Sequence, residues 1–451
     1  MNPIRTLVLI DGEHYPQVTR DAIVTARAGG HEIVAALLMG GIEKLEPDRP
    51  PEVGVDVITV VGPLGEAVGR AISEFGAQVV LDLSDEPVLG YRERMEVAAA
   101  VLAAGAIYQG PDFRFTPPTA ASPPEGVPTL AVIGSGKRTG KTAIAGEVAR
   151  QAAALGLEPI VIAMGRGGPP EPHVVEAGTL TLTGLLDLVR EGQHAASDYL
   201  EDALMTGVTT IGARRAGGGL VGEPFDTNVA EAVALAAARR PGLLVVEGSG
   251  AALPPVAWDA GILVIPASCP LEYLTGYFGP YRLLRTDLAV VTMVSDPVLG
   301  SEEFSALTSH LRVALGDARY VVTDFSPEPL VDVAGRDVFL TTTAPGAVAA
   351  KHAAYLADTF GCQVVGWSAR LADRAGLAED LDSAHGYDVL LTELKAAAVD
   401  TACRKALARG AEVVFVDNRA RVVQGETDLV GFLHAAIELA TVRGSARGSA
   451  Q

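Results

Sequence analysis

The segment Thr129–Ala149, TLAVIGSGKRTGKTAIAGEVA, carries the residues best suited to chemistry. An apolar run enters a loop rich in glycine and lysine, and an alanine-rich stretch follows it. A strand, loop and helix in this order bind phosphate, because glycines let backbone N–H groups approach the oxygens and a helix N-terminus favours negative charge. We therefore expect Lys141 to reach the β- and γ-phosphates of a nucleotide and the Thr142 hydroxyl to contact Mg²⁺. The predicted nucleotide-binding residues are Ser135, Gly136, Lys137, Arg138, Thr139, Gly140, Lys141, Thr142 and Ala143.

This loop departs in one place from the GxxxxGK[ST] pattern of phosphate-binding loops. Five residues before Gly140 stands Ser135, and the expected glycine is displaced to Gly134. The alternative interpretation is a glycine-rich turn before an ordinary helix. The order of strand, loop, Gly-Lys-Thr and helix favours a P-loop NTPase domain.

Two further features refine the nucleotide site. Lys137 and Arg138 add positive charge inside the loop, where it would balance a phosphoryl group during transfer. The segment PGLLVVEGSG ends an apolar strand at Glu247, a usual place for a second contact to Mg²⁺; an exposed glutamate before a turn is the alternative. We therefore predict catalytic roles for Lys141, Lys137 and Glu247, with Thr142 and Glu247 as metal ligands.

The sequence also indicates which nucleotide is bound. A guanine-reading [NT]KxD motif is missing from Val290–Asp296, VVTMVSD, where a later strand would carry it. ATP is therefore expected rather than GTP.

Cations outside the loop are candidates for binding an anionic substrate. Arg166, in MGRGG, follows a strand and is expected at the carboxyl edge where α/β sheets bind ligands. Arg214 and Arg215 precede three glycines, a pattern that favours an anion nest, although two solvated arginines on a mobile loop would give the same sequence. His14 follows the first strand, and Lys395 is expected to begin a helix after a later strand; chance surface positions explain both almost as well. All five are predicted to bind substrate.

Composition limits the classes of partner. The chain has 451 residues and a formal net charge of −20. This acidic balance argues against a nucleic-acid or anionic-membrane surface, since both need a basic face, but not against a small anion held by local cations. Three widely separated cysteines fit a reducing cytoplasm, and no stretch approaches the ~20 apolar residues of a membrane span. The sequence leaves open whether the chain forms a homo-oligomer.

Short apolar runs alternate with alanine-rich stretches along most of the chain. This alternation predicts the α/β class, with several domains of mostly parallel sheet flanked by helices. The proline-rich segment Pro111–Pro128 is the clearest linker, since proline continues neither a helix nor a central strand. We expect a Rossmann-like α/β domain at 1–125, a central P-loop NTPase domain at 126–330 and a C-terminal α/β domain at 331–451. The closing RGSARGSAQ is expected to be disordered.

The phosphate loop and the EGSG sequence at Glu247 resemble the ATP-dependent synthetases that include dethiobiotin synthetase. A closer resemblance, to the cyclic 2,3-diphosphoglycerate synthetase family, covers nearly the whole chain. It is carried by LIDGEHYP, GSGKRTGKTA, GARRAGGGLVGEPF, YLTGYFGPYR and LLTELKAAAVD with VVFVDNR. The resemblance implies an ATP-dependent ligase that uses Mg²⁺ and closes 2,3-diphosphoglycerate into a ring by forming an intramolecular phosphoanhydride, releasing ADP and phosphate.

Two other functions remain open. A kinase acting on 2-phosphoglycerate or a related acid would use the same ATP site with a hydroxyl nucleophile, and Glu13 or His14 would serve as its base. The alternative from another class is a nucleotide-switch protein that delivers metals or cofactors to a partner. The missing guanine motif and the lack of a Cys/His metal pair argue against that alternative.

Overall fold

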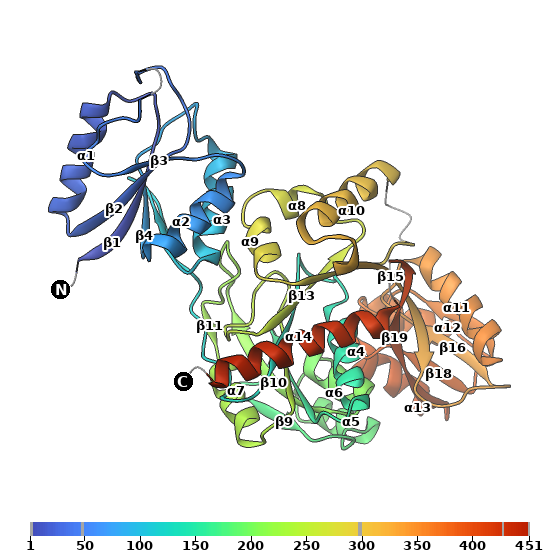
Figure 1. Ribbon diagram of the computed structural model, residues 1–451. Coiled ribbons are helices and arrows are strands. Elements are labelled where there is room, and N and C mark those ends of the chain that lie inside the picture. Colours follow the sequence, from blue (N-terminus) through green and yellow to red (C-terminus); the bar gives the residue numbers. More distant parts are fainter. Residues whose placement is uncertain (1–2, 47–48, 296–299, 426–427, 450–451) are drawn as a thin grey trace. The chain divides into compact units, whose positions relative to one another are not determined.

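The computed structural model describes residues 3–46, 49–295, 300–425 and 428–449. Its contacts divide the chain into two compact units: Met1–Thr119 with Pro270–Arg285, and Ala120–Cys269 with Thr286–Gln451. Each unit has its own sheet (Figure 1). Asp296, the last residue of the segment searched for a guanine-reading motif, lies outside the described residues.

The first unit is built around a six-stranded sheet. Its elements are β1 (Ile4–Ile10), α1 (Pro16–Ala28), β2 (His31–Leu38), β3 (Val57–Thr59), α2 (Leu64–Phe75), β4 (Val79–Asp82), α3 (Tyr91–Ala103), β5 (Ile107–Gln109), β6 (Arg114–Phe115), α8 (Glu272–Thr275) and α9 (Gly279–Leu284). The strand order is β3-β2-β1-β4-β5-β6, and only the β5–β6 pair is antiparallel. Helix α1 lies on one side of the sheet and α2 with α3 on the other (Figure 1). Strand order therefore reverses between β1 and β4, the position where such sheets bind ligands.

The second unit contains a larger sheet that includes the phosphate loop. Its strands are β7 (Thr129–Gly134), β8 (Pro159–Gly165), β9 (His173–Val175), β10 (Thr209–Ala216), β11 (Asp226–Thr227), β12 (Leu243–Glu247), β13 (Ala260–Pro266), β14 (Leu288–Thr292), β15 (Tyr320–Pro329), β16 (Asp337–Thr341), β17 (Gln363–Ser368), β18 (Val389–Thr392) and β19 (Glu412–Gln424). They are ordered β11-β10-β8-β12-β7-β13-β14-β15-β19-β18-β16-β17, with β9 beside β10.

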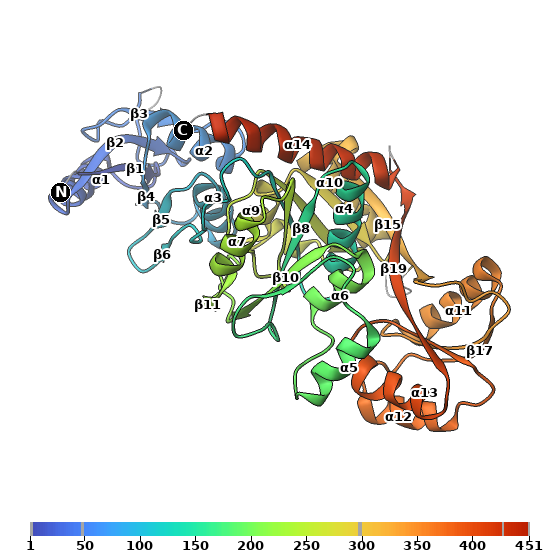
Figure 2. The ribbon, with the colours of Figure 1, turned by 90° about the horizontal axis from the view of Figure 1, so that it is seen from below.

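The helices of the second unit are α4 (Lys141–Ala154), α5 (Leu182–Arg190), α6 (Asp198–Thr206), α7 (Val229–Ala238), α10 (Ser301–Leu315), the 3-10 helix η1 (Asp317–Arg319), α11 (Gly346–Phe360), α12 (Arg374–Ser383), the π-helix η2 (Ala398–Cys403), α13 (Arg404–Ala408) and α14 (Leu429–Ser449). Helix α14 packs against α4 and lies over β7 and β13 (Figure 2). Strands β7 and β12 are buried at every residue, as expected of parallel strands covered by helices. Phe432 and Leu433 of α14 join Ile144 and Val148 of α4 in one hydrophobic core. The C-terminal helix therefore closes the core that supports the phosphate loop.

A long antiparallel ribbon of β15 and β19 connects two groups of parallel strands. The pairing runs from Val322 opposite Gln424 to Pro329 opposite Val416. On one side β15 runs parallel to β14, and on the other β19 runs parallel to β18. Because the ribbon itself is antiparallel, β16 and β18 run opposite to the strands around β7, so that their carboxyl ends point back towards the phosphate loop.

The structure confirms the predicted fold class of α/β with mostly parallel sheets flanked by helices. No helix in the described part of the chain is long and apolar enough to cross a membrane. The domain boundaries at 125 and 330 stay predictions; contacts place the described residues on both sides of 330 in one unit.

Two local expectations were wrong. Lys395 does not begin a helix but lies in a turn, because Ala396 has a φ of 40° that no α-helix accommodates, and helical turns start only at Ala398. The C-terminal end is helical up to Ser449 rather than disordered, since Arg447 forms an ion pair with Asp259 at 3.0 Å.

We expect Phe432→Ala to destabilise the second unit by about 3–5 kcal/mol, because Phe432 is 2% exposed in the core that holds α14 against α4. Val442→Ala, on the same helix but 60% exposed, is the control and should change stability by less than about 0.5 kcal/mol. Hydrogen exchange of the β7 and α4 amides across a denaturant series measures both. Equal effects of the two substitutions would contradict the proposed role of α14.

Candidate functional site

The phosphate loop connects β7 to α4, and its backbone is shaped to receive an anion. Gly140, at the N-cap of α4, has a φ of 87° and no side chain to cap the helix. The first N–H groups of α4 therefore point into the loop with the positive end of the helix dipole. A Cβ on Gly140 would lie 2.5 Å from Phe325 Cζ, so glycine is required both by the φ and by the approach of β15.

The side chain of Lys141 bends back into the phosphate loop. Its Nζ donates to the Gly136 carbonyl at 3.0 Å and lies 3.4 Å from Thr139 Oγ1. Burial lowers the pKa of Lys141, while Glu247 opposes that change. The ammonium is therefore held where phosphate oxygens would replace these internal partners.

Thr142 and Glu247, which the sequence analysis names as candidate metal ligands, meet at the start of α4. The Thr142 hydroxyl donates to Glu247 Oε1 at 2.9 Å. Glu247 ends β12, directly beside β7, and is 3% exposed. Burial raises its pKa to about 8, and its second oxygen, Oε2, has no hydrogen-bond partner among the described residues. This acceptor is free to take a further ligand.

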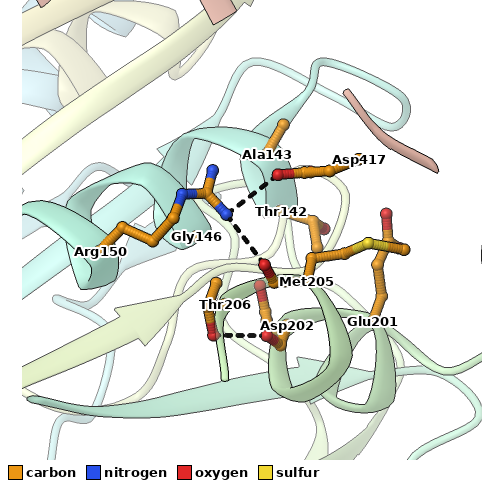
Figure 3. Close-up of a pocket in the computed structure, with 9 residues that line it drawn as sticks. All are labelled: Thr142, Ala143, Gly146, Arg150, Glu201, Asp202, Met205, Thr206 and Asp417. Atoms are coloured by element: carbon orange, nitrogen blue, oxygen red, sulfur yellow. Dashed lines mark hydrogen bonds and ion pairs between the residues drawn. The ribbon is translucent and has the colours of Figure 1, made fainter. Parts of the chain in front are cut away.

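Asp202 on α6 is a site residue that sequence reasoning missed. It lines a pocket with Thr142 and Arg150 (Figure 3). Both of its carboxylate oxygens are buried, and neither has a hydrogen-bond partner in the described part of the chain. Burial raises the pKa of Asp202 well above its ordinary value, and Glu247 raises it further. A buried carboxyl without a partner must either keep its proton or receive a cation.

The C-terminal strands contribute Lys395 to the same site. Lys395 forms an ion pair with Glu201 of α6, next to Asp202 in the sequence. Burial raises the pKa of Glu201 to about 7, although Lys395 opposes this rise. For Lys395 itself, burial acts to lower the pKa, but the charges of Glu201 and Asp198 hold it above its ordinary value. The turn after β18 thus reaches the helix that faces the phosphate loop.

A second set of ion pairs fixes β19 to α4. Arg150 of α4 donates to the Met205 carbonyl at 3.3 Å and contacts Asp417 Oδ2 at 3.0 Å (Figure 3). Arg419, two residues further along β19, lies 3.1 Å from Glu147 of α4. These contacts bridge α4, α6 and β19 around the pocket, so the pocket has a charged and well-anchored wall.

Arg166 and Arg215 are brought together, whereas Arg214 is directed elsewhere. Arg166 follows β8 and Arg215 lies on the neighbouring β10. Both approach Gly250, since a Cβ there would lie 3.0 Å from Arg166 Nη2 and 3.5 Å from Arg215 Nη2. Arg214 Nε lies 3.8 Å from Asp226 on β11, because successive residues of a strand face opposite sides.

The remaining predicted residues of the loop lie around its turn. Ser135 and Thr139 are buried, while Lys137 and Arg138 are exposed. Arg138 has a φ of 59°, which turns the chain at the tip of the loop. Ala143 lies in the first turn of α4, beside the pocket of Figure 3.

His14 belongs to the first unit and lies after β1. Its Nδ1 is 2.8 Å from Asp11 Oδ1, and Asp11 also accepts the backbone N–H groups of His14 at 3.0 Å and Asp85 at 2.7 Å. Asp11 therefore orients the ring and ties the ends of β1 and β4 together.

Asp198, Glu201 and Asp202 had one signal in the sequence. In SDYLED the acids are spaced i, i+3 and i+4, which places them on one face of a helix. That spacing is also typical of an exposed helix surface. Only the contact of α6 with α4 distinguishes the two cases.

Comparison with protein-family models identifies three consecutive matches. The P-loop domain of cyclic 2,3-diphosphoglycerate synthetase matches residues 129–323. The N-terminal domain of the same synthetase matches residues 5–116, and its C-terminal domain matches residues 329–419.

Curated relatives with that same name align over nearly their whole length. The protein from Rubrobacter xylanophilus is 46% identical over 418 residues, covering 92% of this chain and 94% of the relative. The protein from Methanothermobacter thermautotrophicus is 39% identical over 441 residues, 95% of each chain. The protein from Thermococcus sibiricus is 40% identical over 415 residues, covering 91% of this chain and 94% of the relative. The chain therefore belongs to the cyclic 2,3-diphosphoglycerate synthetase family.

Proposed function

We propose that the protein is an ATP-dependent ligase that closes 2,3-diphosphoglycerate to its cyclic phosphoanhydride and releases ADP and phosphate. The observation that carries this proposal is the convergence of cations on one loop. Burial lowers the pKa of Lys141, and the positive charges of Lys395 and Arg166 lower it further. The loop by itself would be enough to bind a nucleotide. Additional cations beside the loop fit a second substrate that carries several negative charges.

The unpaired buried oxygens support Mg²⁺ as the metal ion. Asp202 Oδ1, Asp202 Oδ2 and Glu247 Oε2 have no hydrogen-bond partner among the described residues. The described residues contain no cluster of three His, Cys, Asp or Glu side chains that would hold a metal ion by themselves. This fits Mg²⁺ in nucleotide sites, which takes one or two carboxylates and completes its shell with phosphate oxygens and water. Thr142, Glu247 and Asp202 would hold the ion, which would neutralise charge on the β- and γ-phosphates.

The residues of the chain act mainly by position and charge. An oxygen of one substrate phosphate attacks the γ-phosphorus in line, and the bond to ADP breaks. The second substrate phosphate then attacks the activated phosphorus of the first, closes the ring and releases inorganic phosphate. Phosphates are ionised at neutral pH, so no strong base is needed. Lys141 and Lys137 stabilise the charge that develops on the transferred group.

The proposal predicts that ³¹P NMR of the purified protein with ATP, Mg²⁺ and 2,3-diphosphoglycerate will show new upfield anhydride resonances together with ADP and phosphate. Turnover of 2-phosphoglycerate to a bisphosphate would instead favour the kinase. ATP hydrolysed at the same rate without any glycerate would favour the nucleotide switch.

We expect Lys141→Ala to reduce ATP turnover at least ~100-fold, because the loop loses the ammonium directed at the transferred phosphate. Lys351→Ala, which removes an exposed lysine from α11, is the matched control and should retain the full rate. The comparison is made on initial rates of ADP release. An unchanged rate in Lys141→Ala would rule out the phosphate-loop assignment.

The buried carboxyl of Glu247 predicts a pH-dependent stability. Burial raises the pKa of Glu247 to about 8. Between the ordinary pKa of a glutamate and pH 8, the folded protein therefore keeps a proton that the unfolded chain has lost. Stability in EDTA should therefore fall as pH rises from about 5 to about 8, by an amount on the order of 3–4 kcal/mol. Glu247→Gln should flatten this decline, and Glu231→Gln, at an exposed position on α7, should not.

Added Mg²⁺ should reverse the loss of stability at pH 8 in the wild type, since the ion favours the charged carboxylates. Asp202→Asn should be more stable than the wild type in EDTA and gain less from Mg²⁺. Calorimetric unfolding temperatures with and without Mg²⁺ measure both effects. Equal Mg²⁺ stabilisation of all variants would contradict the metal assignment.

A further inference from the structure

Three neighbouring strands end around one small space near the phosphate loop. In the order β10-β8-β12, they carry Arg215, Arg166 and the turn Gly248–Gly250 at their carboxyl ends. A Cβ added to Gly250 would approach both guanidinium groups, at 3.0 Å from Arg166 Nη2 and 3.5 Å from Arg215 Nη2. The two guanidinium groups therefore lie against the same backbone position, where a side chain larger than that of glycine would crowd them.

The two arginines lack the acidic partners that arginines usually have. Within residues 3–46, 49–295, 300–425 and 428–449, no carboxylate forms an ion pair with either one. Arg215 is held by backbone carbonyls alone, from Nη1 to Gly217 at 2.6 Å and from Nη2 to Ser249 at 2.9 Å. Its Nε is buried and has no hydrogen-bond partner in the part of the chain that the structure describes. In a chain with a net charge of −20, two unneutralised guanidinium groups on one space indicate a place for an anion.

The electrostatics of Arg215 agree with this geometry. Burial lowers the pKa of Arg215, and the positive charge of Arg166 lowers it further. The two like charges therefore repel each other until an anion enters between them. A carboxylate would neutralise one arginine, whereas a phosphate dianion matches both and accepts N–H groups from two directions.

We propose that Arg166 and Arg215 form an anion subsite that binds a phosphate group of the acid substrate, apart from the nucleotide phosphates bound by residues 134–142. This inference rests on the proposed function, because it assigns a subsite to its second substrate. Gly250 lies three residues after Glu247, and Glu247 accepts a hydrogen bond from Thr142 at 2.9 Å, so the subsite lies beside the start of α4. Gly250 determines how much room the bound phosphate has.

The test is isothermal titration calorimetry of the full chain with 2,3-diphosphoglycerate and, separately, with Mg²⁺ and ADP. Arg166→Ala is the main variant, since within the described residues the Arg166 guanidinium makes no hydrogen bond that the fold would lose. We expect it to weaken diphosphoglycerate binding at least tenfold and to leave ADP binding within twofold. Arg239→Ala removes an arginine of the same unit that pairs with Glu176 on the surface, and should change neither affinity more than twofold.

Two further variants distinguish the effect of the positive charge of Arg166 from the effect of the room beside Gly250. Arg166→Lys keeps the charge but loses the planar fork, so a three- to fivefold loss is expected. Gly250→Ala keeps both arginines and fills the space between them, and should weaken diphosphoglycerate binding about as much as Arg166→Ala. Its φ of 61° strains an alanine slightly, so unchanged ADP affinity serves as the check that the loop is intact.

The outcomes distinguish a failure of the subsite from a failure of the proposed function. Unchanged diphosphoglycerate affinity in Arg166→Ala, or an equal loss of ADP affinity, overturns the subsite. If the wild type binds pyrophosphate but not diphosphoglycerate, and Arg166→Ala abolishes pyrophosphate binding, the subsite stands and the proposed substrate is wrong. A wild type that binds neither compound overturns the subsite.

Discussion

The antiparallel pairing of β15 with β19 is the constraint on which the second unit depends. If β19 ran parallel to β15, the carboxyl ends of β16 and β18 would point away from the phosphate loop. The antiparallel ribbon reverses them, and Lys395, in the turn after β18, reaches Glu201 on α6. Arg150 and Asp417 join α4 to β19 within the same pocket. One choice of strand direction therefore brings residues almost 200 positions apart into one site.

This arrangement sets up an imbalance of charge that a ligand would correct. On the α6 side, Asp202 and Glu247 have buried oxygens without partners, and their pKa values are raised mainly by burial. On the β8 side, Arg166 and Arg215 have no acidic partner among the described residues. In the proposed function, a metal ion would neutralise the first group and a phosphate the second. The unpaired buried groups therefore cost free energy when no ligand is bound, and a ligand that pairs with them would remove that cost.

The sequence predicts what depends on local pattern and misses what depends on contacts between distant segments. Lys141 and Thr142 could be found because they begin a helix after a glycine-rich loop, and Glu247 because it ends an apolar strand. Asp202 could not, since acids at i, i+3 and i+4 look the same on a solvated helix and on one packed against α4. The turn at Lys395 was missed because an alanine-rich segment favours helix, whereas the positive φ of Ala396 is imposed by its surroundings.

The cations of the site also differ in the hydrogen bonds that they would lose on binding phosphate. Lys141 already donates to the Gly136 carbonyl, so a nucleotide must replace that bond and the loop must adjust. Arg166 makes no such bond within the described residues and loses only water. In the proposed function, binding of the acid to the arginines would therefore require little rearrangement, whereas binding of the nucleotide would displace the hydrogen bond of Lys141 within the loop. Attack on the γ-phosphorus needs both groups in line, so in the proposed reaction the adjustment of the loop around Lys141 would be the step that aligns them.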